Sequence, residues 1–181
     1  MKVAAFWFRR DLRLQDNTGL NHALDSGLPV LPVFIFDENI INDLQADDAR
    51  VSFIHQTLES INSNLINQNS SLLCIKGKPE AVWSQLADTY DIAAVYTNKD
   101  YEPYALERDV TVKTLLKQRG IDLHLFKDQV IFEESEVVKD DGKPYTVYTP
   151  YKNKWLSHFD RSKVTPKTQN GTFAKLTFEF P

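Results

Sequence analysis

Five short apolar runs recur along the first 126 residues, and segments with helical patterning separate them. The runs cover residues 3–8, 29–36, 71–76, 92–97 and 121–126. They are nearly continuous in apolar residues, as strands tend to be when helices cover both faces of a sheet. Strands that alternate with helices in this way predict a mainly parallel sheet.

Helix signals occupy the segments between the runs. Five apolar residues between positions 51 and 65 recur at spacings of three and four, which predicts a long amphipathic helix. Pro79 and Pro103 stand where two further helices would begin, and Gly27 and Gly120 stand where helices would end. The predicted fold is therefore of the α/β class, a doubly wound, open, parallel five-stranded sheet of Rossmann-like (HUP) type with helices on both faces.

The pattern loosens after the fifth run. Residues 145–155 mix aromatic and basic side chains, and residues 173–181 are apolar without a clear partner. We divide the chain into an α/β domain over residues 1–135, an aromatic and basic extension over 136–159 that packs on this domain, and a linker over 160–181. Because the chain stops within this linker, we expect it to be a fragment whose linker leads to a further domain.

Composition narrows the function classes. A chain of 181 residues with 42% hydrophobic and 25% charged residues is typical of one globular domain. Its net charge of −4 argues against a strongly basic surface that grips nucleic acid. Cys74 is the single cysteine, so a disulfide framework or a cysteine metal site cannot form. We expect a cytoplasmic protein, because the cysteine usage fits a reducing compartment and no apolar run reaches membrane length.

Local catalytic motifs are missing from the sequence. It contains neither a Gly-x-Gly-x-x-Gly or Walker-type phosphate loop nor a Gly-x-Ser-x-Gly nucleophile elbow. The four histidines are scattered, and none has neighbours at metal-ligand spacing. We therefore expect neither catalytic residues nor a metal site in this chain.

Charged residues follow the first, second and fourth apolar runs. The carboxyl ends of parallel strands meet at one edge of a sheet, where open α/β sheets bind ligands. We therefore expect a pocket there lined by Arg10, Asp37, Asp100 and Glu102. Phe34 would stack on a flat polar heterocycle, and the charged side chains would hydrogen-bond to its edges. The residues alone leave open the alternative that these groups form only helix caps, turns and surface ion pairs.

Several longer motifs point to one family. The stretch WFRRDLRLQDN at residues 7–17 closely resembles the opening signature of the DNA photolyase and cryptochrome family. Other stretches resemble landmarks of that family and follow in the family's order. They are residues 33–37, 48–50, 100–105 with 108–109, and 148–155.

The resemblance implies the N-terminal α/β domain of a photolyase, which holds a light-harvesting antenna chromophore. In this family the catalytic FAD sits in a larger helical C-terminal domain, so this chain alone is expected to be inactive. The parent enzyme would repair UV-induced pyrimidine dimers by light-driven electron transfer from FAD. Its expected partners are its own helical domain and UV-damaged DNA, with no membrane, and we expect a monomer.

The identity of the antenna follows from the same resemblance. Members that use methenyltetrahydrofolate typically carry an Asn-Glu pair at the positions matching Tyr104 and Ala105, so that contact is lost here. Members that bind an 8-hydroxy-5-deazaflavin type chromophore or FMN match this chain better, at Arg10, Phe34, Asp37, Asp100 and Glu102. Two alternatives remain open: the same domain of a signalling cryptochrome, and a stand-alone nucleotide-binding α/β protein.

Overall fold

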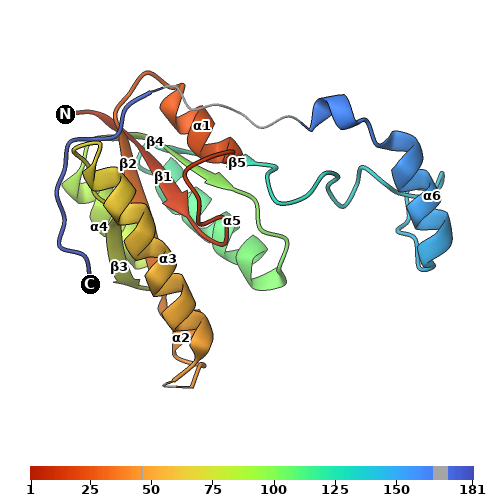
Figure 1. Cartoon of the computed structure of the whole chain (residues 1–181), viewed down its shortest axis with the longest axis horizontal. Helices are drawn as coiled ribbons and strands as arrows, with labels where there is room; N and C mark the ends of the chain where they lie inside the picture. The colour runs from red at the N-terminus through yellow and green to blue at the C-terminus, as the bar shows by residue number, and fades with distance from the viewer. Residues whose placement is uncertain (46, 165–170) are drawn as a thin grey trace.

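The sheet of this protein has five strands, all parallel. The computed structural model describes residues 1–45, 47–164 and 171–181. Its sheet has the strand order β3-β2-β1-β4-β5 (Figure 1). The strands are β1 (Val3–Phe8), β2 (Val30–Asp37), β3 (Leu73–Gly77), β4 (Ile92–Asn98) and β5 (Asp122–Phe126). Each coincides with one of the apolar runs, and the predicted α/β class is confirmed.

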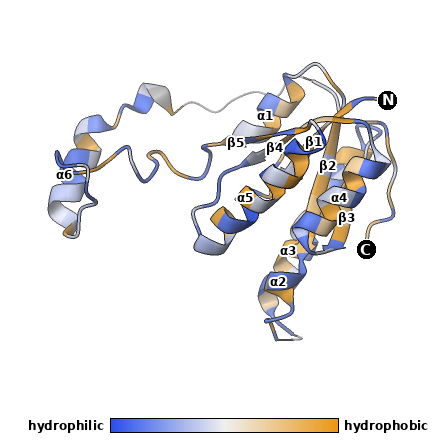
Figure 2. Ribbon diagram, turned by 180° about the vertical axis from the view of Figure 1, so that it is seen from behind, coloured by the Kyte–Doolittle hydropathy of each residue, from blue (hydrophilic) through white to orange (hydrophobic). Residues whose placement is uncertain are grey.

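Helices cover both faces of the sheet, as predicted. They are α1 (Thr18–Leu24), α2 (Glu38–Ile41), α3 (Ala49–Ile66), α4 (Pro79–Thr89), α5 (Pro103–Lys117) and α6 (Tyr148–His158), followed by a 3-10 turn at Arg161–Lys163. Apolar side chains of α1 and α3 pack on one face, and those of α4 and α5 pack on the other. Figure 2 shows β2 in the hydrophobic colour, enclosed between these helices.

Strand β1 lies at the centre of the sheet, and this position accounts for the continuous apolar run at residues 3–8. All six of its residues are buried. Phe6 and Phe8 meet edge to face on the side of α1 and α3, with ring centroids 4.7 Å apart. Trp7 packs on the opposite side against Trp83 of α4, at 5.5 Å. Successive side chains of this strand therefore contribute to two different cores.

The strand order reverses beside β1. From β1 the chain builds outward through β2 to β3, and it then crosses back so that β4 pairs with the other side of β1. In open parallel sheets the crevice outside the carboxyl ends of the strands at such a reversal is the usual ligand site. The carboxyl ends of β1, β2 and β4 meet at this point.

Polar side chains fix the starts of three helices. Asn17 caps α1 by accepting a hydrogen bond from the backbone N–H of Leu20, at 3.1 Å. Asp37 and Asp48 do the same for α2 and α3. Such caps satisfy backbone donors that the first turn of a helix leaves without partners. Asp37 is therefore both the last residue of β2 and a helix cap.

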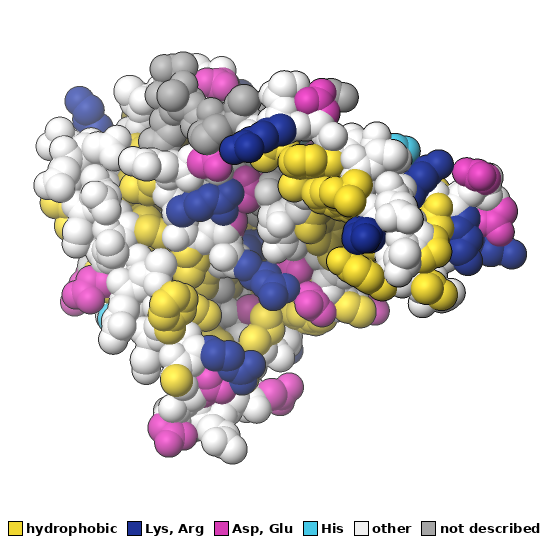
Figure 3. Space-filling view, turned by 45° about the vertical axis from the view of Figure 1, so that its right-hand side comes forward, with side chains coloured by type: hydrophobic (Ala, Val, Ile, Leu, Met, Phe, Trp, Pro, Cys, Tyr) yellow, Lys and Arg dark blue, Asp and Glu magenta, His cyan; other side chains and the backbone are white. Residues whose placement is uncertain are grey.

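The segment after β5 forms an arm beside the sheet (Figure 1). Residues 127–147 contain no strand, and α6 buries none of its residues. Trp155 of α6 meets Phe132 edge to face at 5.3 Å, so the helix is held partly by the segment that precedes it. Figure 3 shows hydrophobic side chains exposed along this arm, as Val147, Tyr148 and Leu156 are. The division of the chain at residues 135 and 159 stays a prediction.

Residues 171–181 return to the sheet, where the sequence had offered no clear partner for them. The backbone N–H of Ala174 donates to the carbonyl of Val30 at 2.7 Å, and Phe173 forms a parallel bridge with Val30. Strand β3 begins its pairing with β2 only at Val33, so this segment fills the position beside Val30. Phe173 and Ala174 are buried. The structure thus supplies the partner that the sequence did not reveal.

Among the described residues, the helices include none with the length and apolarity that crossing a membrane requires.

Candidate binding site

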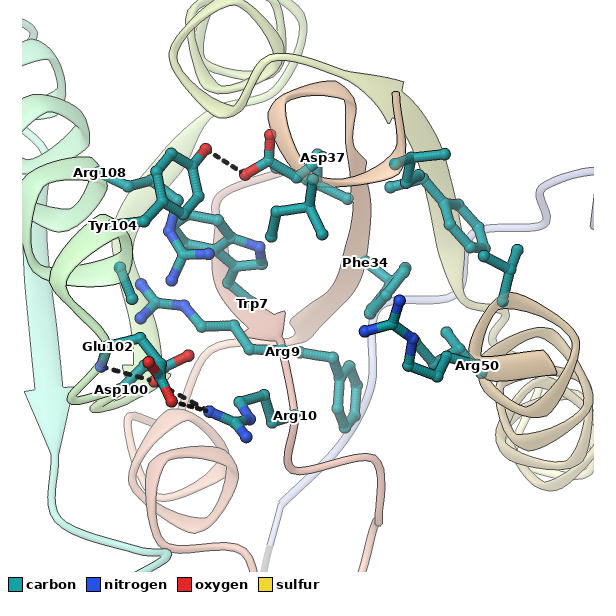
Figure 4. Close-up of a pocket in the computed structure, with 18 of the residues that line it drawn as sticks. Trp7, Arg9, Arg10, Phe34, Asp37, Arg50, Asp100, Glu102, Tyr104 and Arg108 are labelled. Carbon is teal, nitrogen blue, oxygen red and sulfur yellow. Dashed lines mark hydrogen bonds and ion pairs between the residues drawn. The ribbon is translucent and has the colours of Figure 1, made fainter. Parts of the chain in front are cut away.

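A cavity of about 550 Å³ opens at the carboxyl ends of β1, β2 and β4 (Figure 4). The structure brings all five predicted binding residues together around it: Arg10, Phe34, Asp37, Asp100 and Glu102. They come from three separate strand ends, so the shared pocket is a product of the parallel sheet.

The floor and one side of the cavity are apolar. Trp7, Phe34 and Phe36 line it, and the last two rings meet edge to face with centroids 4.9 Å apart. A further side, formed by α2, the turn after it and α3, carries aliphatic residues: Ile40, Ile41, Leu44, Val51 and Ile54. In the sequence, α2 is signalled by the capping residue Asp37 followed by Ile40 and Ile41.

Arg10 lies at the mouth of the cavity, close to two carboxylates. Its Nη1 is 3.5 Å from Oδ1 of Asp100 and 3.4 Å from Oε1 of Glu102. The side chains of Arg10 and Glu102 are 61% and 66% exposed, whereas Asp100 is 11% exposed. Long contacts between exposed charges contribute little to stability. The side chains of Arg10 and Glu102 can therefore turn toward a ligand at little cost to the fold, whereas Asp100 is held by the backbone N–H of Glu102.

Asp37 is engaged by its own chain on both oxygens. Oδ1 accepts from the backbone N–H of Asn39 at 3.0 Å, and Oδ2 accepts from the hydroxyl of Tyr104 at 2.6 Å. Burial, and next the bond to Asp37, raise the pKa of Tyr104 to about 12. The pair joins the end of β2 to the start of α5 and forms one wall of the cavity. From the sequence, Tyr104 is notable only because it replaces a residue that contacts folate in other family members. Its bond to Asp37 is shown by the structure.

Two buried arginines lie below the mouth, and our set of binding residues did not include them. Arg9 forms a two-pronged ion pair with Asp109 of α5, at 2.7 and 2.8 Å. Arg108 contacts the same carboxylate at 3.4 Å. Burial, and next the charge of Arg108, lower the pKa of Arg9. The motifs WFRR and Arg108-Asp109 contained these residues, but only the fold shows that their side chains meet.

Arg50 projects into the cavity from the first turn of α3 (Figure 4). It is held by Asp48, whose Oδ2 lies 2.6 Å from its Nη2. Hydrogen bonds from Arg50 lower the pKa of Asp48 to about 2. Together with Arg10, this residue gives the mouth two exposed guanidinium groups that can donate hydrogen bonds to a ligand.

Comparison with known proteins identifies the family. The family model described as DNA photolyase matches residues 4–170. The chain belongs to the DNA photolyase family. A deoxyribodipyrimidine photo-lyase of Synechococcus sp. (strain PCC 6301) is 33% identical over 164 residues, which are 91% of this chain and 34% of that enzyme. Cryptochromes also occur among the relatives.

Two solved photolyases share the fold. The archaeal photolyase of Sulfolobus tokodaii superposes with a TM-score of 0.77 at 31% identity, over 96% of this chain and 38% of its own. A class III photolyase of Agrobacterium tumefaciens superposes with a TM-score of 0.81 at 28% identity, over 97% of this chain and 36% of its own. The chain thus spans about a third of the photolyases that it matches. The part of each relative that this chain does not cover is consistent with a further C-terminal domain.

Proposed function

We propose that the cavity binds the light-harvesting chromophore of a DNA photolyase. The observation that carries this proposal is the cavity itself, in which an apolar aromatic floor meets convergent charged groups at the reversal of the strand order. Its volume of about 550 Å³ lies within the range of small-molecule sites, and apolar walls with a few placed polar groups are typical of them. A flat heterocycle would lie on Phe34 and present its polar edge to Arg10, Asp100 and Glu102.

The residues fit an 8-hydroxy-5-deazaflavin type chromophore or FMN better than methenyltetrahydrofolate. Tyr104 directs its hydroxyl to Asp37 at 2.6 Å, and Ala105 has no group that could pair with a folate ring. Arg10 can donate to ring carbonyls, and the carboxylates can accept from a ring N–H. The S. tokodaii photolyase, described with two FAD molecules and an implied novel light-harvesting cofactor, supports a flavin-like ring as one option.

For the whole protein we infer repair of UV-induced pyrimidine dimers by light-driven electron transfer from FAD. The support is the family together with relatives named as photo-lyases. The FAD and most contacts to damaged DNA would belong to a further helical domain, with which this chain would interact. The chain alone would then not repair DNA. A monomer in the cytoplasm fits this role, and the single cysteine agrees with a reducing compartment.

The test is a set of parallel titrations of the purified chain with FMN, 8-hydroxy-5-deazaflavin and methenyltetrahydrofolate, measured by equilibrium dialysis. We expect retention of one of the first two. Glu102→Ala should weaken this binding by at least about tenfold, because one charged hydrogen bond is worth about 1.5–3 kcal/mol. Glu107→Ala, on the exposed side of α5, is the matched control and should leave binding unchanged. Preferential retention of the folate, or equal binding by both variants, would contradict the proposal.

A further inference from the structure

Trp7 lies in the wall of the cavity between two guanidinium groups. It is buried, and its indole ring lines the site at the end of β1. The guanidinium carbon of Arg9 is 4.2 Å from the ring centroid, and that of Arg108 is 5.1 Å away (Figure 4). Both distances are within the range of cation–π contact. One tryptophan in contact with two buried cations is therefore part of the proposed chromophore site.

Both cations beside this ring are paired with the same carboxylate. Arg9 and Arg108 contact Asp109, while their guanidinium carbons lie 4.2 and 5.1 Å from the indole centroid. The pKa of Arg9 is lowered first by burial and next by the charge of Arg108, while Asp109 and Asp11 act in the opposite direction. The other carboxylate near Arg9 is Asp11, which accepts from the backbone N–H of Arg9 and from the amide of Asn17.

A tryptophan beside an excited chromophore can waste the absorbed light. One electron would leave the indole ring for the excited chromophore, and its return would restore both ground states while the energy is lost as heat. A cation next to the indole disfavours the departure of that electron, because the ring would become positively charged. Charges interact strongly in a site from which water is excluded. The arrangement around Trp7 therefore opposes quenching.

We propose that Arg9 and Arg108 prevent Trp7 from quenching the excited state of a chromophore bound in this cavity. This inference rests on the proposed function, and it assigns the two arginines a role other than holding the fold. If the cations served only to pack the ring and stabilise the domain, their removal would change stability and leave the emission of the bound chromophore unchanged. The lifetime of that emission therefore separates the two roles.

The experiment loads the purified chain with FMN, and in parallel with 8-hydroxy-5-deazaflavin, and measures the fluorescence lifetime of the bound fraction. Arg108→Met removes one cation and leaves Arg9 paired with Asp109. We expect the lifetime to fall at least about twofold, since the lost charge stood close to the ring. Arg108→Lys keeps the charge and should retain the longer lifetime. Trp7→Phe in the Arg108→Met background should restore it, because the electron donor is then absent.

Three results would overturn the inference. The first is an equal lifetime in the wild type and Arg108→Met, with binding shown by dialysis. The second is a short lifetime that Trp7→Phe does not restore. The third is retention of neither probe by the wild type, which would overturn the proposed function as well, so the dialysis distinguishes the two failures. Near-ultraviolet circular dichroism checks the fold, and Arg108→Gln replaces Arg108→Met if that variant does not fold.

Discussion

Arg9 and Arg10 are neighbours in the sequence, yet their side chains belong to different parts of the molecule. The side chain of Arg9 is 5% exposed and forms a two-pronged ion pair with Asp109. The side chain of Arg10 is 61% exposed, and within the described part of the chain its ion pairs are the long ones to Asp100 and Glu102. Both follow the same buried strand. Burial therefore decides which arginine holds the domain together and which is available to a ligand.

The buried side of this loop is a network that joins four elements. Arg9 ties the end of β1 to α5 through Asp109. The side-chain Nδ2 of Asn98, at the end of β4, donates to Asp11 and to Asn17, and the side-chain Oδ1 accepts from the backbone N–H of Gly19 at 2.7 Å. These groups fix the base on which the exposed residues stand. Mutations in the buried network should therefore lower stability, whereas mutations of exposed residues such as Arg10 should weaken ligand binding.

The largest effect is expected from Asp109→Ala. Removal of this carboxylate leaves Arg9 and Arg108 buried without their anion. Loss of one partner of a buried ion pair costs about 3–5 kcal/mol. We expect a fall of this size in the free energy of unfolding, measured by urea denaturation. Glu107→Ala, on the exposed side of α5, is the control and should change it by less than about 0.5 kcal/mol. Equal stability of the two variants would contradict the structural role of Arg9.

A smaller loss is expected from Asn98→Ala. The variant leaves the carboxylate of Asp11, the side-chain Oδ1 of Asn17 and the backbone N–H of Gly19 each short of one buried partner. Each such group costs about 1–3 kcal/mol, and partial relaxation reduces the sum, so we expect a loss of about 2–3 kcal/mol in the same denaturation assay. Asn67→Ala, at the exposed end of α3, serves as the control. A loss no larger than that of the control would show that water replaces the network.

These contrasts also mark what the sequence could predict. The five strands were predictable because each is an apolar run, and the shared edge of Arg10, Asp37 and Glu102 was predictable because parallel strands end together. The sequence could not predict that Arg9 is buried while Arg10 is exposed, since Arg9 is held by Asp109, a hundred residues further along the chain. The return of Phe173 to Val30 was equally hidden, because isolated apolar residues do not reveal which strand they meet.

Tyr104 and Asp37 form a partly exposed wall of the cavity, and mutation there should have an effect on stability between those of the buried network and of Arg10. Tyr104→Phe removes a hydrogen bond to a charged group at a partly exposed position, so we expect a loss of about 1 kcal/mol. The raised pKa of Tyr104 also gives a pH signature. The unfolded chain ionises this hydroxyl near its ordinary value of 10, whereas the folded protein ionises it near 12. The stability from this group is complete below pH 10 and is lost as the pH rises to about 12.

An absorbance titration of tyrosinate measures this directly. Tyr101 also has a pKa raised to about 12, mainly by burial and by the charge of Glu133. The wild type should therefore show two late-titrating tyrosines, and Tyr104→Phe should show one. If the variant loses a tyrosine that ionises near pH 10 instead, the hydroxyl of Tyr104 does not donate to Asp37 as described.

The smallest change in stability is expected from Arg10→Ala. Its contacts to Asp100 and Glu102 are long and exposed, and pairs of this kind contribute about 0–1 kcal/mol. The free energy of unfolding should therefore stay within about 0.5 kcal/mol of the wild type, whereas the dissociation constant for FMN or the deazaflavin should rise about tenfold. A large loss of stability with unchanged binding would reverse the comparison, because Arg10 would then hold the fold as Arg9 does. A loss of binding at constant stability would show that, at this edge of the sheet, the residues that contact the ligand differ from the residues that stabilise the fold, as Arg10 differs from Arg9.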